Sequence, residues 1–192
     1  YQNNFSDHRP VLWSFSVEEV ELAEGLVINE IMQNPAAVSD AAGEWIEITN
    51  ISNEDISLNG LILMNNDGDE HVISDNNLVL MPDGFVVLGA NDDPSLNGGV
   101  TVDYIYSGFT LSNLWDEVIL AHPSGQILDE VYYDNGETFP DEVGASMILL
   151  DPTLDNSLGE NWAVADIVSG SGDYGTPGDV NYPCTEPIGD LN

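Results

Sequence analysis

Short apolar runs separated by turn-forming residues characterise the chain from residue 26 onwards. These runs are Leu26–Met32, Trp45–Ile48, Leu61–Met64, Phe85–Leu88, Val118–Ala121, Ile127–Tyr132 and Met147–Leu150. Clusters of Gly, Asn, Asp and Pro lie between them, among them Asn59-Gly60, Asp67-Gly68 and Pro82-Asp83-Gly84. Short runs bounded by such clusters are typical of β-strands, and no stretch keeps a helical period over three turns. The pattern therefore predicts an all-β sandwich or barrel.

The remaining segments carry weaker signals. Residues 91–117 hold no clear strand apart from Val102–Tyr106, so we expect a long loop that crosses between two sheets. Residues 16–25 are predicted to form an acidic linker, and residues 182–192 a second tail or linker. The chain starts at Tyr1 without a Met, a basic segment or an apolar leader. We therefore expect it to be part of a longer protein whose signal peptide lies outside it.

Charge narrows the functions that such a fold can carry. The chain has 35 acidic residues and a single basic one, Arg9, which gives a formal net charge of −34 on 192 residues. Nucleic-acid binding depends on Lys and Arg that neutralise phosphates, so we expect no direct nucleic-acid binding by this module. The missing lysine also excludes the phosphate-binding lysine of P-loop and kinase sites. A cation-binding surface, a partner-binding module or a spacer remains.

The hydrophobic content argues for a folded domain outside the cell. Hydrophobic residues make up 42% of the chain, too many for a disordered acidic tail. Trp45 and Trp162 are predicted core residues, and Trp115 is predicted to lie partly buried in a loop. No apolar run approaches the ~18 residues of a membrane span, so we expect no membrane insertion. Because salt screens the self-repulsion of such a surface, we expect a secreted or cell-surface (extracellular) protein with a protein or cell-surface partner.

Residues 28–35, INEIMQNP, and residues 43–50, GEWIEITN, closely resemble the lamin-tail domain family. Further family-like segments follow in the family's order: Leu58–Gly60, Phe109–Asn113, Asp129–Tyr133, Gly144–Met147, Asn161-Trp162 and Gly175–Gly178. The resemblance spans residues 26–181. It implies an immunoglobulin-like β-sandwich without catalytic activity, known from nuclear lamins and from bacterial secreted proteins. Nuclear members contact chromatin, a role that the charge of this chain contradicts.

Residues 1–15 carry a second resemblance. Ser6-Asp7-His8-Arg9-Pro10-Val11 resembles the closing segment of the endonuclease/exonuclease/phosphatase family. There the residue matching His8 is the general base for the attacking water, and the residue matching Asp7 orients it. The resemblance implies a Mg²⁺-dependent nuclease or phosphoesterase parent, of which this segment is the C-terminal remnant. Its metal ligands would lie upstream, so the Asp7–His8 pair alone cannot hydrolyse phosphodiesters. A chance match of so short a motif is the alternative.

Glu30, Glu44 and Glu47 suggest the paired carboxylates of a glycosidase. Glu44 and Glu47 are three residues apart on an expected strand, so their side chains should point to opposite faces. We therefore predict no catalytic residue in the sandwich. The expected role of these carboxylates is structural: they accept hydrogen bonds from backbone amides of neighbouring loops.

The loop that starts at Asn65 is the candidate metal site, with Asn65, Asp67 and Asp69 as weak calcium ligands. An EF-hand loop would need Gly at its sixth position and Glu at its twelfth, where this chain has Glu70 and Asn76. The stronger prediction for Asp67-Gly68 is a hairpin turn. Apart from this candidate Ca²⁺ site, the sequence indicates no required cofactor.

The histidines and the cysteine add no catalytic constellation. His71 and His122 lie far apart in the sequence and are expected to be ordinary surface residues. Cys184 is either a partner for a cysteine outside this chain or a reactive thiol. The sequence therefore predicts a non-catalytic accessory module for attachment, positioning or protein binding, beside a metal-dependent nuclease. The alternatives are a calcium-dependent adhesion module and, less favoured, an independent hydrolase.

Overall fold

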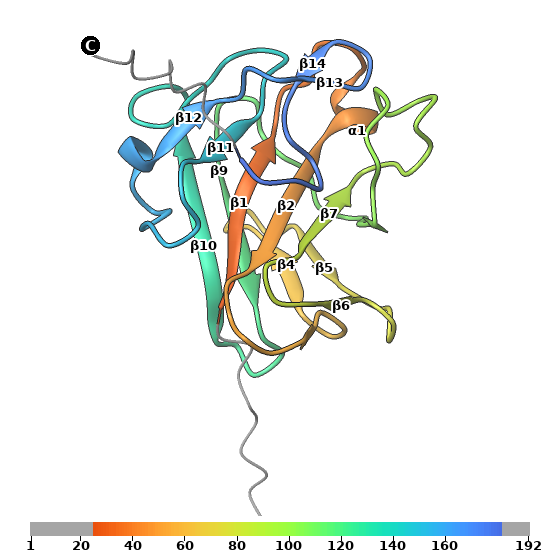
Figure 1. The fold of residues 1–192 in the computed structure, drawn as a ribbon, viewed down its shortest axis with the longest axis vertical. Coiled ribbons are helices and arrows are strands. Elements are labelled where there is room, and N and C mark those ends of the chain that lie inside the picture. Colours follow the sequence, from red (N-terminus) through yellow and green to blue (C-terminus); the bar gives the residue numbers. More distant parts are fainter. Residues whose placement is uncertain (1–24, 182–192) are drawn as a thin grey trace, which may run out of the picture.

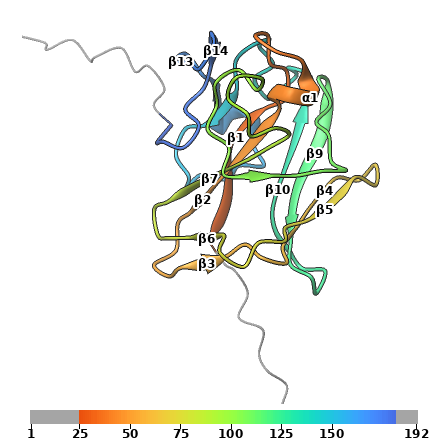
Figure 2. The ribbon, with the colours of Figure 1, turned by 90° about the vertical axis from the view of Figure 1, so that its right-hand side faces the viewer.

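A computed structural model describes residues 25–181 as a β-sandwich (Figures 1 and 2). One sheet has the strand order β12 (Trp162–Val164), β11 (Met147–Leu149), β1 (Leu26–Met32), β2 (Trp45–Asn50), β7 (Phe85–Gly89) and β8 (Tyr104–Ile105). The other has the order β10 (Ile127–Asp134), β9 (Trp115–Ala121), β4 (Ile62–Met64) and β5 (Glu70–Val72). Figure 2 shows them as two layers. The all-β, immunoglobulin-like sandwich expected from the sequence is confirmed.

Two short strand pairs and two short helices complete the described chain. The strand pairs are β3 (Ile56–Ser57) with β6 (Val79–Leu80), and β13 (Val168–Ser169) with β14 (Asp173–Tyr174). The helices are α1 (Asp40–Gly43) and the 3-10 helix η1 (Gly159–Asn161). Within residues 25–181, no helix is long and apolar enough to span a membrane. The remnant expected at residues 1–15, nearly all of the acidic linker and the tail at 182–192 lie outside the described residues.

Side chains from the facing sides of the two sheets form the core. Fully buried members of this core come from both layers: Ile28, Ile46, Ile48, Leu63, Val118, Leu120 and Val131. Each such Ile, Leu or Val contributes about 1.5–3 kcal/mol by leaving water. Trp162 also belongs to this core, as predicted, and packs near Phe139, with ring centroids 6.0 Å apart.

The six-stranded sheet is buried on its second face as well. Met32, Trp45, Val87 and Val100 form a separate apolar cluster there. In β2, Trp45 and Glu47 alternate with Ile46, which points into the sandwich core, so the two faces of this strand carry different environments. Burial of both faces explains why all six residues of β2 are buried. The prediction that Trp45 is a core residue is confirmed.

Residues 173–181, here called the closing segment, run over this second face. In Figure 1 their blue trace crosses β1 and β2. An isolated parallel bridge joins Tyr174 to Ala145, just before β11. Asn181, at the other end, donates hydrogen bonds to the carbonyl oxygens of Asn29 (2.8 Å) and Leu149 (3.0 Å). The closing segment therefore spans the strands β11, β1 and β2.

Each apolar run predicted from the sequence lies in or overlaps a strand, but one boundary is wrong. Residues 115–117, expected in a loop, begin β9 and pair with residues 132–134 of β10. The acidic pair Asp116-Glu117 hides the strand signal because it interrupts the apolar run. Trp115 is 65% exposed, so the prediction of partial burial is also wrong. Its side chain stands on the side of the hairpin that faces away from the core.

Candidate functional site

Glu30 and Glu47 lie opposite each other on β1 and β2, beneath the closing segment. A bulge at Ile28–Glu30 inserts Asn29 as an extra residue beside them. Both glutamates are fully buried, which is rare for a carboxylate without a cationic partner. The chain supplies no Lys or Arg after Arg9, so backbone amides, hydroxyls and an amide side chain take the place of a cation.

Glu30 accepts hydrogen bonds from two directions. The amide of Thr176 donates to Oε1 at 2.8 Å, and the Ser146 hydroxyl donates to the same oxygen. The Thr176 hydroxyl lies 2.8 Å from Oε2. Gly175 explains the close approach, because a Cβ at that position would lie only 3.0 Å from Glu30 Oε1 and 3.1 Å from the Trp45 ring. Glu30 thereby ties β11 and the closing segment to β1.

Glu47 holds the next turn of the same segment. Its Oε2 accepts the Gly178 amide, and its Oε1 accepts the Asn29 side-chain amide at 2.9 Å. Gly178 has a φ of 85°, a left-handed conformation that favours glycine, and this turns its amide toward the carboxylate. The sequence Gly175-Thr176-Pro177-Gly178 therefore supplies both the amides and the backbone shape that this pair of glutamates requires.

The two carboxyl groups share an environment that favours a proton. Burial raises the pKa of Glu47 to about 8, and the neighbouring Glu30 charge adds to the increase. Burial also raises the pKa of Glu30, although the bonds from Ser146 and Thr176 oppose it. Glu30 accepts three hydrogen bonds and Glu47 accepts two, so the charged form is better stabilised at Glu30. We therefore assign the negative charge to Glu30 and the proton to Glu47 at neutral pH. Asn29 Oδ1 is buried without a hydrogen-bond partner among the described residues. If the Asn29 side-chain amide is turned by about 180°, this oxygen accepts a hydrogen bond from the protonated Glu47.

Glu44 points to the opposite side, as predicted from its spacing to Glu47. Its Oε2 accepts the Leu111 amide at 3.2 Å, and Leu111 belongs to the sandwich core. Burial raises the pKa of Glu44 to about 7, and the charges of Asp40 and Asp116 add to the increase. The predicted role of the three glutamates as acceptors for loop amides is therefore confirmed. The pairing of Glu30 with Glu47, which sequence reasoning missed, is visible only once β1 is aligned antiparallel to β2.

A second polar cluster joins the bulge in β1 to the four-stranded sheet. Asp129 of β10 accepts the Ile28 amide at 2.6 Å. Asn156 donates to the same carboxylate oxygen at 2.8 Å and to the Ile28 carbonyl at 3.1 Å. These bonds satisfy the backbone groups that a bulge leaves without a strand partner. They fix the position of Asn29 and Glu30 relative to the core.

The candidate calcium loop is a hairpin turn between β4 and β5, as the stronger prediction stated. Asn65 Oδ1 accepts three backbone amides, those of Asp67, Gly68 and Asp69, at 2.9–3.1 Å. Asp69 accepts the amide and the hydroxyl of Thr110. Two of the three predicted ligands are therefore engaged within the protein. Across residues 25–181, no group of three His, Cys, Asp or Glu side chains is placed to hold a metal ion.

The other acidic loops are built from the same kind of turn. Asp93, Asp151 and Asp155 each accept the amide and the hydroxyl of a Ser or Thr two residues later. The hydroxyl bond in each case lowers the pKa of the aspartate. Part of the acidic surplus thus has a structural role in shaping turns. The charge count alone cannot separate this role from cation binding.

His71 is more than the surface residue expected from the sequence. Its Nε2 lies 2.9 Å from the Tyr104 hydroxyl, and its Nδ1 lies 3.0 Å from the Ser107 carbonyl oxygen. These contacts connect β5, an edge strand of one sheet, to β8, an edge strand of the other. His122 lies in a turn and contacts Ser124. Asp7, His8 and Cys184 lie outside the described residues, so their predicted roles stay predictions.

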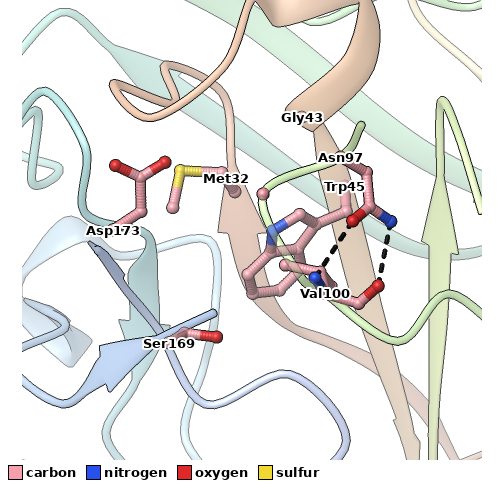
Figure 3. Close-up of a pocket in the computed structure, with 8 residues that line it drawn as sticks. Met32, Gly43, Trp45, Asn97, Val100, Ser169 and Asp173 are labelled. Carbon is pink, nitrogen blue, oxygen red and sulfur yellow. Dashed lines mark hydrogen bonds between the residues drawn. The ribbon is translucent and has the colours of Figure 1, made fainter. Parts of the chain in front are cut away.

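A small cavity lies over the Trp45 ring (Figure 3). Its walls are Met32, Gly43, Trp45, Asn97, Gly98, Val100, Ser169 and Asp173. Asn97 closes one side through hydrogen bonds to the backbone of Val100. The cavity volume is about 10 Å³, room for one water molecule. It is too small for a substrate and does not include the paired glutamates.

The family comparison agrees with this architecture. A sequence model of the Lamin Tail Domain matches residues 20–135. A solved structure of a DUF4876 family protein from Bacteroides thetaiotaomicron resembles the chain with a TM-score of 0.48 and 12% sequence identity, over 85% of this chain and 73% of that one. No curated protein matches the sequence. Because the Lamin Tail Domain match covers more than half of the sequence, the chain belongs to the lamin tail domain family.

Proposed function

We propose that this chain is an immunoglobulin-like accessory module of a secreted or cell-surface protein, in which it serves attachment, positioning or protein binding. Membership of the lamin tail domain family supports a module without catalytic activity. The extracellular setting is supported by the composition, with 35 acidic residues against one basic residue. A protein or cell-surface partner fits such a module better than a nucleic acid, whose phosphates this surface repels.

The position of the Glu30–Glu47 pair is the observation that carries this proposal. The pair has the chemistry of an acid and a base held close together. Both carboxyl groups are fully buried, and the closing segment lies on them. Their hydrogen bonds hold the amides of Thr176 and Gly178. A pair engaged in this way stabilises the fold and has no access to a substrate.

The proposal includes a neighbouring Mg²⁺-dependent nuclease or phosphoesterase. Its support is the resemblance of residues 6–11 to the end of that enzyme family, with His8 as base and Asp7 as its orienting partner. The test uses the gene extended upstream of Tyr1. DNA degradation with magnesium should be lost in His8→Ala and retained when the sandwich is removed. Degradation that survives His8→Ala would discard this part of the proposal.

The 192-residue chain itself is expected to be inert. Incubation with plasmid DNA or bis(4-nitrophenyl) phosphate and Mg²⁺ should give no turnover above the buffer. Glu47→Gln, which keeps the shape of the side chain and removes its acid function, serves as the matched variant. Turnover by the wild type that is lost in a Glu47→Gln variant at least as stable as the wild type would contradict the non-catalytic assignment.

Calcium-dependent adhesion is the alternative, and melting temperatures separate the two. Any divalent cation screens a charge of −34, so calcium and magnesium should raise the melting temperature by equal amounts. A specific site would add a stabilisation that depends on calcium alone. The comparison is therefore Ca²⁺ against Mg²⁺ at equal concentration, for wild type and Asp67→Asn. A larger increase in melting temperature with calcium than with magnesium, lost in Asp67→Asn, would favour the adhesion alternative.

A further inference from the structure

The outer face of the four-stranded sheet is apolar where an antiparallel sheet is usually polar. Val118, Leu120 and Val131 point into the core, so their neighbours along β9 and β10 point outward. The outward side chains include Met64, Val72, Trp115, Ile119, Ile127 and Tyr132, here called the outer patch. None of them belongs to either buried apolar cluster. Antiparallel sheets that face water normally place polar residues there.

Strand register arranges the outer patch in rows. Met64 of β4 lies opposite Ile119 of β9, and Ile119 lies opposite Glu130 of β10. On the other side Met64 lies opposite Glu70 of β5. This row therefore runs from a carboxylate through two apolar side chains to a second carboxylate. In the next row Glu117 lies opposite Tyr132.

Four side chains of the outer patch are exposed. Trp115 is 65% exposed and Tyr132 is 42% exposed, although both are large enough to add several kcal/mol when buried. Val72 and Ile127, at the two edge strands, are exposed as well. Ile119, between Met64 and Glu130, is buried. An apolar area with a polar rim is typical of a protein interaction surface.

Charge selects the partner. Residues 25–181 contain no Lys or Arg, so the described surface supplies neither to pair with its own carboxylates. A second copy of the chain or an anionic surface would bring more negative charge and be repelled. A cation beside Trp115 would gain both the ring face and a carboxylate such as Glu117. A neutral glycan would gain nothing from the field of the protein.

We propose that the outer patch binds a basic amphipathic polypeptide segment. Its apolar side chains cover Trp115 and Tyr132, and its Lys or Arg side chains pair with Glu70, Glu117 and Glu130. This inference rests on the proposed function as a binding module and names the class of partner. It needs no movement of the sandwich, because the patch is preformed on the rigid sheet.

The test titrates the full chain with a synthetic leucine–lysine peptide that has one apolar face, by calorimetry at low and physiological salt. Trp115→Ala should weaken binding at least about ten-fold, as expected for an aromatic anchor. Met81→Ala, which truncates an equally exposed apolar residue off the patch, should change the affinity less than about two-fold. Melting temperatures check that both variants fold.

A second pair of variants distinguishes binding at the outer patch from general attraction of the basic peptide to a negatively charged protein. Glu117→Gln with Glu130→Gln should weaken binding more than Glu54→Gln with Glu142→Gln, which removes the same charge elsewhere. Equal weakening would overturn the proposal, because binding would then follow net charge alone. Two other results would also overturn it: Trp115-dependent binding of a neutral polysaccharide, or Trp115-dependent self-association. None of these results affects the non-catalytic assignment, which only turnover by the chain would contradict.

Discussion

Replacing Glu30 with alanine should lower the free energy of unfolding by about 3 kcal/mol, or the melting temperature by roughly 10 °C. The amide of Thr176 and the hydroxyls of Thr176 and Ser146 would lose a shared acceptor in a buried site. Each buried donor without a partner costs about 1–3 kcal/mol. Removal of the Glu30 charge, which burial disfavours, offsets part of this loss. Chemical denaturation of wild type and variant measures the difference.

Glu70→Ala is the matched control, since Glu70 also lies on a strand but is exposed at a sheet edge. Its replacement should change the free energy of unfolding by less than about 0.5 kcal/mol. Equal effects of the two substitutions would show that Glu30 does not hold the closing segment. A large effect of Glu30→Ala without change in the closing segment would assign its role to β1 and β11 instead.

The stability of the protein should fall as the pH rises from about 4.5 to about 8. In the unfolded chain Glu47 loses its proton near 4.5, whereas in the folded protein it keeps the proton until about pH 8. Between these values the folded state binds more protons, so the free energy of unfolding decreases with rising pH. The decrease ends above pH 8, and its size for Glu47 is on the order of a few kcal/mol. Denaturation midpoints across this range measure it.

Glu47→Gln isolates this contribution. The glutamine keeps an oxygen for the Gly178 amide and has an amide that can donate to the unpartnered Asn29 Oδ1. In this variant the free energy of unfolding should therefore no longer show the decrease with rising pH that Glu47 causes. Glu44→Gln should remove a different part, which ends near pH 7, because burial raises the pKa of Glu44 to about 7. An unchanged slope in Glu47→Gln would mean that Glu47 is ionised in the folded protein at neutral pH.

Strands with a strong apolar pattern could be predicted from the sequence. Leu26–Met32 is a strand with the predicted bounds, and Trp45 and Trp162 are buried as expected. The short strands β3, β5, β6, β12, β13 and β14 were not predicted, because two or three residues hold no period. The start of β9 was missed because Asp116 and Glu117 break the apolar run. Their pairing with β10 is a tertiary effect that local propensity cannot show.

The candidate site could be predicted only in part, because the residues that meet there are far apart in the sequence. Opposite directions for Glu44 and Glu47 follow from strand geometry alone. The contact between Glu30 and Thr176 joins residues 146 positions apart, so no local pattern announces it. Gly175-Thr176-Pro177-Gly178 resembles a family motif, yet its contact with the glutamates follows only from the fold. The same holds for Trp115, whose outward direction depends on the register with β10.

The family signature acquires a structural meaning from these contacts. Glu30 lies in the INEI segment and Glu47 in the GEWIEI segment, and together they hold the closing segment. Asp129 and Asn156 fix the bulge that places Glu30. These buried polar residues hold the closing segment and the bulge in place on the six-stranded sheet. Binding is left to exposed surfaces such as the outer patch.

Amide hydrogen exchange in wild type and Glu30→Ala tests the structural role of the paired glutamates most directly. In the wild type the amides of Thr176 and Gly178 should be protected nearly as well as those of β9 and β10. In Glu30→Ala their protection should fall well below that of the β9–β10 hairpin, because the closing segment would open without unfolding the core. Unchanged protection of Thr176 and Gly178 in the variant would contradict the role assigned to the pair.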